Sequence, residues 1–239
     1  VGLVGIWMGG CEKLTQEQKV EKLIKQLQDQ NVDVRMNTVR ALGKIGTPEA
    51  IKAAEDAIPF LIQQLQNDQD KWVRMLAAMA LGPIGGGAVN AVPALIQALQ
   101  DQDVNVRMNA IRALMLIGTP AAIKAAEGAI PFLIQQLQND QDKWVRMLAA
   151  MALGAVGEGT KDAVPALIQA LQDQNISVRY YAAYALGKIG KDAKDAVPAL
   201  IQALQNDHNV RGRDSATIAL EKIGTPEALK AVKEYQSRQ

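Results

Sequence analysis

Cysteine and histidine are almost absent from this sequence, and their scarcity excludes several kinds of site. The chain has one Cys and one His in 239 residues. A single cysteine, Cys11, allows no internal disulfide, and a single histidine, His208, cannot build a metal cluster. The sequence also has no glycine-rich phosphate loop and no Cys-His or Ser-His arrangement beyond this histidine. We therefore expect no catalytic residue, no metal site and no cofactor.

Aromatic residues and an excess of charge are scarce as well. Phe, Trp and Tyr make up 4% of a chain that is 49% hydrophobic, so aliphatic side chains must build the core. The 26 basic and 25 acidic residues give a net charge of +1, whereas duplex-binding proteins usually carry a clear basic excess. No run approaches the roughly 20 apolar residues of a membrane span. This composition favours closely packed helices and argues against a nucleic-acid partner.

The sequence repeats itself at two levels. Segment 51–82 recurs as 123–154 with one change, Asp56 to Gly128, which indicates the duplication of a two-repeat unit. A finer period of 33 to 39 residues is marked by one arginine in each repeat. Residues 1–18 precede the array, and 19–239 form one solenoid. The six predicted repeats are 19–46, 57–85, 91–118, 129–157, 163–190 and 196–239.

Each repeat has the pattern of two helices. The first, as in "AVPALIQALQD", places a proline in its first turn and an apolar residue every three or four positions. The second, as in "VRYYAAYALGKIG", ends at a glycine suited to a left-handed C′ position. After three repeats, "GTP" adds a threonine cap and an extra helical turn. A hairpin of about 30 residues buries its apolar face only against its neighbours. The sequence therefore predicts an all-α, right-handed α-solenoid of six helical hairpins.

The repeat pattern D-x5-VR-x2-AA-x-ALG-x-IG resembles the HEAT-like repeats of the phycobilisome-lyase type. This resemblance spans most of the chain and implies a non-catalytic fold that binds other proteins. It also implies an alternative function, that of a phycobilin lyase or chaperone-like accessory protein for soluble pigment proteins. A HEAT-like DNA-repair protein is a third reading, but the sequence lacks a basic groove for it.

An aspartate stands six residues before the arginine of every repeat. We expect the aspartate to cap the second helix and the arginine to form a bidentate pair with a neighbouring repeat's aspartate. These residues are therefore interpreted as a structural ladder between repeats. The ladder comprises Asp29 and Arg35, Asp68 and Arg74, Asp101 and Arg107, Asp140 and Arg146, Asp173 and Arg179, and Asp207 and Arg213.

The first eleven residues, "VGLVGIWMGGC", have three interpretations. An apolar stretch that ends in small residues before Cys11 resembles the tail of a bacterial lipoprotein signal, in which the cysteine is lipidated. We expect further residues upstream of Val1, with the solenoid anchored on the extracytoplasmic or periplasmic side of a bacterial membrane. The alternatives are a truncated membrane anchor, or a buried capping segment with a free thiol. A cytoplasmic location goes with the pigment-protein function.

Large apolar side chains recur where the second helices should face solvent. In HEAT arrays these helices line the concave surface, and a self-sufficient helix should expose Lys, Glu or Gln there. Apolar residues at such positions indicate a contact surface for a partner protein or complex, which could be membrane-embedded. The alternative is packing between repeats, as we expect for Leu76 and Leu148. The predicted partner-binding residues are Trp72, Met75, Met79, Trp144, Met147, Met151, Tyr180, Tyr181 and Tyr184.

Overall fold

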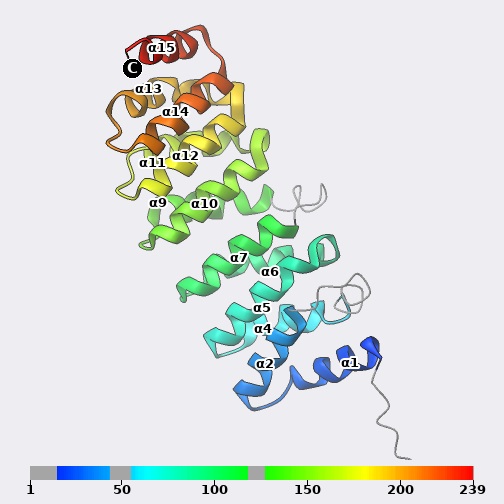
Figure 1. Ribbon diagram of the computed structural model, residues 1–239. Helices are drawn as coiled ribbons and strands as arrows, with labels where there is room; N and C mark the ends of the chain where they lie inside the picture. The colour runs from blue at the N-terminus through cyan, green and yellow to red at the C-terminus, as the bar shows by residue number, and fades with distance from the viewer. Residues whose placement is uncertain (1–14, 44–54, 118–126, 239) are drawn as a thin grey trace, which may run out of the picture.

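The computed structural model describes residues 15–43, 55–117 and 127–238, and these ranges contain helices and no strand (Figure 1). Helices follow one another in antiparallel pairs, so the predicted all-α solenoid of helical hairpins is confirmed. The first helices of the pairs are α1 (Gln16–Gln26), α4 (Ile58–Asn67), α6 (Val92–Ala98), α9 (Ile130–Asn139), α11 (Val164–Ala170) and α13 (Val197–Asn206). The second helices are α2 (Val32–Gly43), α5 (Lys71–Ile84), α7 (Val104–Ile117), α10 (Lys143–Val156), α12 (Ile176–Ile189) and α14 (Val210–Ile223).

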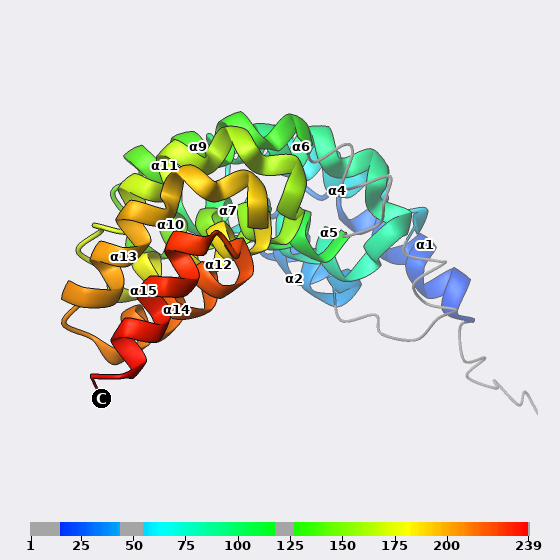
Figure 2. The same ribbon diagram turned by 90° about the horizontal axis from the view of Figure 1, so that it is seen from above.

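The pairs stack into an arc with an outer and an inner layer (Figure 2). The first helices lie along the outside of the arc, and the second helices line its inside. Because each second helix packs on the second helix of the next pair, the inside of the arc is a continuous helical layer. This arrangement places the solvent-facing side chains of α2, α5, α7, α10, α12 and α14 on one concave face, which we call the inner surface.

The core lies between the two layers and repeats with the helices. Leu61, Leu95, Leu167 and Leu200 hold the same position in four first helices, and each is fully buried. Second helices contribute small side chains, such as Ala77 and Ala78, and complete burial of a leucine stabilises the fold by about 1.5–3 kcal/mol. Each pair therefore buries its apolar side against its neighbours, as a solenoid requires.

A glycine inside the second helix allows the next second helix to approach closely. A Cβ added at Gly82 or Gly154 would lie 3.1 or 3.0 Å from the Cα of Ala113 or Ala185. In α7 the same position holds Met115, and α7 packs less extensively on α10 than on α5. Figure 1 shows α10 correspondingly set apart from α7. The junction between the two copies of the duplicated unit is thus the looser one.

Glycines also end the second helices, but in a different conformation from the one predicted. Gly85, Gly157 and Gly190 have φ of 65–72° with ψ between −134° and −128°, which is the mirror image of extended backbone. The left-handed helical conformation occurs only at Gly224 among the described glycines. The difference arises because the first three glycines begin a 3-10 segment that leads to the next first helix. These segments are η1 (Gly85–Ala91), η3 (Gly157–Ala163) and η4 (Gly190–Ala196), and a shorter one, η2 (Glu127–Ala129), precedes α9.

The last "GTP" starts a full helix rather than an extra turn. Thr225 caps α15 (Pro226–Gln236) by accepting a hydrogen bond from the Ala228 N–H at 3.2 Å. Ala228 and Val232 are buried, so α15 covers the C-terminal end of the core. The other two "GTP" sites, at 46–48 and 118–120, lie outside the described residues.

The predicted N-terminal signal or anchor, including Cys11, lies outside the described residues. Among the described helices, the stretch Lys71–Ala98 is apolar and long enough to cross a membrane by length and composition. It comprises α5, η1 and α6, and half of its most apolar window is buried in the molecule. Helices that are mostly buried in a protein core pass the same test of length and composition, so this stretch is only weak evidence for a membrane span.

Candidate functional site

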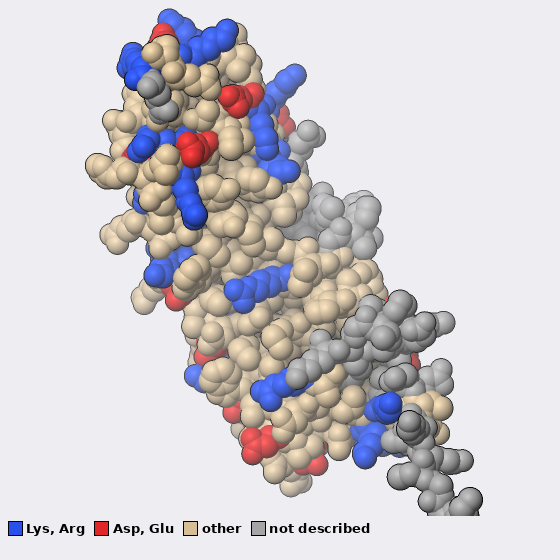
Figure 3. Space-filling view, viewed as in Figure 1, with Lys and Arg blue, Asp and Glu red and all other residues tan. Residues whose placement is uncertain are grey.

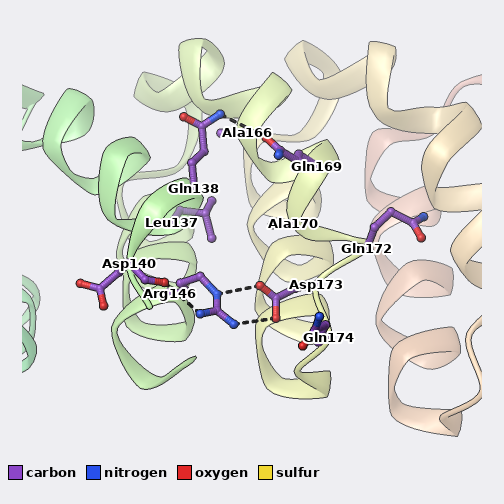
Figure 4. Close-up of a pocket in the computed structure, with 10 residues that line it drawn as sticks. All are labelled: Leu137, Gln138, Asp140, Arg146, Ala166, Gln169, Ala170, Gln172, Asp173 and Gln174. Carbon is purple, nitrogen blue, oxygen red and sulfur yellow. Dashed lines mark hydrogen bonds and ion pairs between the residues drawn. The ribbon is translucent and has the colours of Figure 1, made fainter. Parts of the chain in front are cut away.

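The aspartate of the predicted ladder lies in the loop between the two helices of each pair, and the arginine lies near the start of the second helix. Arg146 shows the geometry: its Nε and Nη2 donate to the two carboxylate oxygens of Asp173 in the next pair, at 2.7 and 3.1 Å (Figure 4). Its Nη1 donates to the backbone carbonyls of Asp140 and Gln141 in its own loop. One guanidinium thus fixes a loop and joins it to the next repeat. The same bidentate arrangement joins Arg35 to Asp68, Arg74 to Asp101, Arg107 to Asp140 and Arg179 to Asp207.

The ends of the ladder differ from its middle. Arg213 pairs with no aspartate side chain among the described residues, and its Nε donates instead to the Tyr235 hydroxyl on α15 at 3.0 Å. Its Nη1 still donates to the Asp207 carbonyl of its own loop. At the other end, Asp29 accepts the Asn31 N–H, and no arginine pairs with it among the described residues. The pairing expected for all six repeats is therefore wrong at Asp29 and Arg213, since neither has a ladder partner among the described residues.

The cap of the second helix is two residues further along than predicted. The Asp140 carboxylate accepts the Asp142 N–H, and Asp142 in turn caps α10 by accepting the Trp144 and Val145 N–H groups. Asn175 and Asn209 hold the same position as Asp142 and cap α12 and α14. The ladder aspartates therefore shape their loops, and all of them except Asp29 also pair with an arginine, while the residue two positions later caps the helix.

Two ladder pairs, Arg146–Asp173 and Arg179–Asp207, shift the pKa values of both of their members. The hydrogen bond with Asp207 raises the pKa of Arg179 and lowers the pKa of Asp207. Burial opposes the change at Asp173, but hydrogen bonds from Arg146 and from the Asn175 N–H still hold its pKa below the usual value. Both shifts favour the ionised pair, which is what a structural ion pair requires.

A shallow cleft lies above the Arg146–Asp173 pair, between α9 and α11 (Figure 4). Gln138 and Gln169 bridge the cleft with a hydrogen bond of 3.3 Å between their side chains. Equivalent clefts occur at other junctions between pairs, lined by the equivalent leucine, glutamine and aspartate residues. A cleft that recurs at several junctions of the stack follows from the stacking, and we assign it no ligand.

The tryptophans of the predicted contact surface are exposed on the inner layer. Trp72 and Trp144 lie in the first turns of α5 and α10, and 47% and 48% of each residue is exposed. The ammonium groups of Lys71 and Lys143 each lie 5.5 Å from the ring centroid of the tryptophan that follows. An exposed indole beside a cation is a suitable anchor for a partner side chain.

The predicted methionines and tyrosines are less uniform. Met79 is exposed, whereas Met75, Met147 and Met151 are half-buried against the core. Leu76 and Leu148 are buried, as expected for residues that pack between repeats. The structure therefore makes Met79 the most accessible of the predicted methionines.

Three tyrosines form a cluster on α12. The rings of Tyr180 and Tyr181 meet edge to face at a centroid distance of 5.1 Å, and those of Tyr181 and Tyr184 at 6.4 Å. Two ammonium groups, of Lys188 and of Lys222 from α14, lie 5.6 and 5.8 Å from the Tyr184 ring centroid. All three tyrosines are half-buried, so each presents only part of its ring to a partner.

Three exposed apolar residues on second helices are not among the predicted contact residues. Leu116 on α7 is 62% exposed, and Val210 and Ile218 on α14 are 57% and 49% exposed. Ile218 stands five residues after its repeat arginine, the position that Met79 and Tyr184 hold in their repeats. This shared position could have predicted the exposure of Ile218. Leu116 gives no such signal, because the equivalent position in other repeats holds charged residues such as Lys188 and Lys222.

Within residues 15–43, 55–117 and 127–238, no group of His, Cys, Asp and Glu is arranged to hold a metal ion.

Comparisons with known proteins agree with this architecture. A family model for HEAT repeats matches residues 7–59, 58–131, 130–221 and 165–238. No curated protein matches the sequence.

Among solved structures, the chain is similar to the crystal structure of an engineered protein from the Northeast Structural Genomics Consortium. The two are 29% identical with a TM-score of 0.71, and the match covers 91% of this chain and 97% of the engineered one. A second engineered protein from the same consortium is 30% identical with a TM-score of 0.70, and 86% of this chain matches 58% of its length. A designed armadillo repeat protein in complex with the peptide (KR)4 shares the fold at 21% identity, with a TM-score of 0.74 over 86% of this chain and all of that one. Since the family model matches repeat after repeat from residue 7 to residue 238, the chain belongs to the HEAT-repeat family.

Proposed function

We propose that the protein is a non-catalytic scaffold that holds a partner protein along its inner surface. One observation carries this proposal: Trp72 and Trp144, at equivalent places two repeats apart, are each about half exposed. Such side chains cost solubility on a surface without a partner, and tryptophan is enriched among residues that dominate binding energy. HEAT and armadillo-like repeats typically serve as scaffolds for protein–protein interaction.

The spacing of the exposed side chains supports an elongated partner. Met79 on α5, Leu116 on α7, Trp144 on α10 and Ile218 on α14 are distributed along the arc rather than gathered in a pocket. A designed armadillo repeat protein of the same fold is in complex with a peptide, (KR)4, which shows that such an array can hold a short chain. We infer that this inner surface also takes an elongated segment.

The test is to remove both tryptophans. Trp72→Ala with Trp144→Ala should weaken partner binding by about 2 kcal/mol or more, as for other hot spots. Unfolding free energy should change by less than about 0.5 kcal/mol per site, because exposed side chains add little to folding. Affinity capture and thermal melting on the same variant measure both quantities.

A matched control is Leu229→Ala, which truncates an exposed leucine on α15. It should leave capture and melting unchanged. If the double variant instead melts far below the parent and still captures the partner, the tryptophans stabilise the array and the proposal is wrong.

We also propose that the scaffold is held at a membrane through Cys11, because the residues before it resemble a bacterial lipoprotein signal. Stable anchoring needs more than one acyl chain on that cysteine. Protein expressed from the complete gene should then partition into detergent, and Cys11→Ser should move it to the aqueous phase. Intact mass showing an unmodified Cys11 would contradict this proposal. The pigment-protein function implied by the lyase-type resemblance stays a prediction.

A further inference from the structure

The four central second helices carry no acidic residue. Helices α5, α7, α10 and α12, covering 71–84, 104–117, 143–156 and 176–189, contain Lys and Arg but neither Asp nor Glu. The aspartates of this region lie in the preceding loops, where they bind ladder arginines or cap helices. Figure 3 shows Lys and Arg set singly across the middle of the face, with Asp and Glu toward its ends and along one edge. The middle of the inner surface is therefore cationic and apolar.

The overall composition does not reveal this local excess of positive charge. Helices α4, α6, α9, α11 and α13 contain no charged residue at all and expose glutamines instead. Acidic groups elsewhere bring the net charge to +1. A balanced total thus coexists with a local field on one face, and such a field selects partners by their charge.

Three cations on these helices are available to a partner. Arg112, Lys143 and Lys188 are exposed, and none has an ion-pair partner among the described residues. Lys71 differs, since its ammonium lies 3.3 Å from the Asp103 carboxylate. At the Tyr184 ring, Lys188 converges with Lys222, whose stem lies over Gly187. Two like charges brought onto one ring favour an anion between or beside them.

We propose, as an extension of the scaffold function above, that the partner segment is acidic: an extended stretch of protein with carboxylates spaced among apolar residues. Its carboxylates pair with Arg112, Lys143 and the Lys188–Lys222 pair, and its apolar side chains contact Trp72, Trp144 and Leu116. Adjacent helices stand about 8–10 Å apart, and an extended chain advances about 3.3 Å per residue. The four steps from α5 to α14 therefore correspond to a segment of about 10–12 residues.

Nucleic acid fits this surface less well. Duplex DNA presents one negative charge for about every 1.7 Å of its axis. On this surface there is only about one free cation per helix, and exposed apolar side chains separate these cations. Widely spaced carboxylates on an apolar segment match both features.

The test uses the full chain and two synthetic peptides of about 14 residues, with Glu at every third position among Phe, Met and Gly, or with Lys replacing each Glu. Calorimetry should show binding of the Glu peptide only, weakening about tenfold or more between 50 and 300 mM salt. Lys143→Glu with Lys188→Glu should weaken it by about tenfold or more. The matched control, Lys161→Glu with Lys191→Glu, changes two exposed lysines of η3 and η4 by the same charge and should bind normally.

Other outcomes overturn the acidic assignment. Equal binding of both peptides, lost on Trp72→Ala with Trp144→Ala, would mean that the scaffold function stands while the charge preference is wrong. Binding of neither peptide, or equal weakening by both pairs of lysine changes, would also refute it. Tighter binding of single-stranded poly(U) RNA, in competition with the Glu peptide, would assign the surface to nucleic acid.

Discussion

The helical pairs α4–α5 and α9–α10 have nearly the same sequence but different neighbours. Comparing them shows which structural properties follow from the sequence of a pair and which follow from the repeats packed against it. Asp70 and Asp142 cap the two second helices with the same φ of −82° and with ψ of 122° and 124°. Trp72 and Trp144 are exposed to the same extent within one percentage point. Capping and the exposure of the first turn are therefore local properties that the duplication carried along.

Properties that depend on the next repeat differ between the copies. Lys71 pairs with Asp103, but the position equivalent to Asp103 in the second copy holds Asn175. Leu116 lies over Gly82, whereas Tyr184 lies over Gly154. Met79 is exposed and its equivalent, Met151, is half-buried. Duplication thus produced two equally exposed tryptophans, and the neighbouring repeats gave the two copies different charge and different accessibility nearby.

The arginine–aspartate pair that joins the two copies should be more sensitive to mutation than the pairs within them. Arg107 pairs with Asp140, whose side chain is 4% exposed, against 13% for Asp101 and Asp173 within the copies. Arg107→Ala leaves that carboxylate buried and unpaired, which should cost about 3 kcal/mol of unfolding free energy in urea. Arg213→Ala is the control, because Arg213 has no carboxylate partner in the described chain and should cost about 1 kcal/mol. Equal losses for the two variants would show that the ion pair adds nothing to the hydrogen bonds.

Placing a methionine at Gly154 should loosen the packing of α10 on α12, so that it resembles the looser packing of α7 on α10. Gly154→Met copies the Met115 of α7 onto α10, where its Cβ would meet the Ala185 backbone at 3.0 Å. We expect a loss of about 1–3 kcal/mol from overpacking, measured by urea unfolding. Ala155→Met, at the next and exposed position, should change stability by less than about 0.5 kcal/mol. If both variants are equally stable, the glycine does not set the helix spacing.

The sequence predicts the features that recur in every repeat and misses those that depend on one neighbour. The leucine, arginine and glycine registers give the helical pairs and the ladder partners, because burial and ion pairing repeat with the fold. The cap was assigned to Asp140 rather than Asp142, because an aspartate at either place can accept a backbone N–H. Leu116 was missed because its register holds charged residues in other repeats. The contact of Lys71 with Asp103 requires the path of two side chains, which spacing alone does not provide.

A buried glutamine occurs at the same place in both copies and nowhere else in the register. Gln64 and Gln136 are 7% exposed, and their Oε1 atoms have no hydrogen-bond donor among the described residues. The equivalent residues are alanines in the third, fifth and sixth repeats, Ala98, Ala170 and Ala203, and the half-buried Gln26 in the first. Gln136→Leu should raise the unfolding free energy by about 1 kcal/mol, because it removes an unsatisfied acceptor. Gln135→Leu, at an exposed position, is the control and should have no effect, whereas a loss of stability in Gln136→Leu would reveal a donor for Oε1.

Exchanging Asp103 and Asn175 should have the smallest effects, with little change in stability and a moderate change in binding. Asp103 and Asn175 accept equivalent backbone N–H groups, from Asn105 and Ser177, both at 2.9 Å. Because Asp and Asn cap equally well, exchanging them should alter stability by less than about 1 kcal/mol. Asn175→Asp should give Lys143 the carboxylate that Lys71 already has, and thereby weaken binding of the Glu peptide about threefold. Asp103→Asn should free Lys71 and strengthen binding by a similar factor. If calorimetry shows that the two variants change peptide affinity in opposite directions, the neighbouring repeat sets the free charge of each copy. If both variants change affinity in the same direction, the residues at 103 and 175 act on the peptide directly.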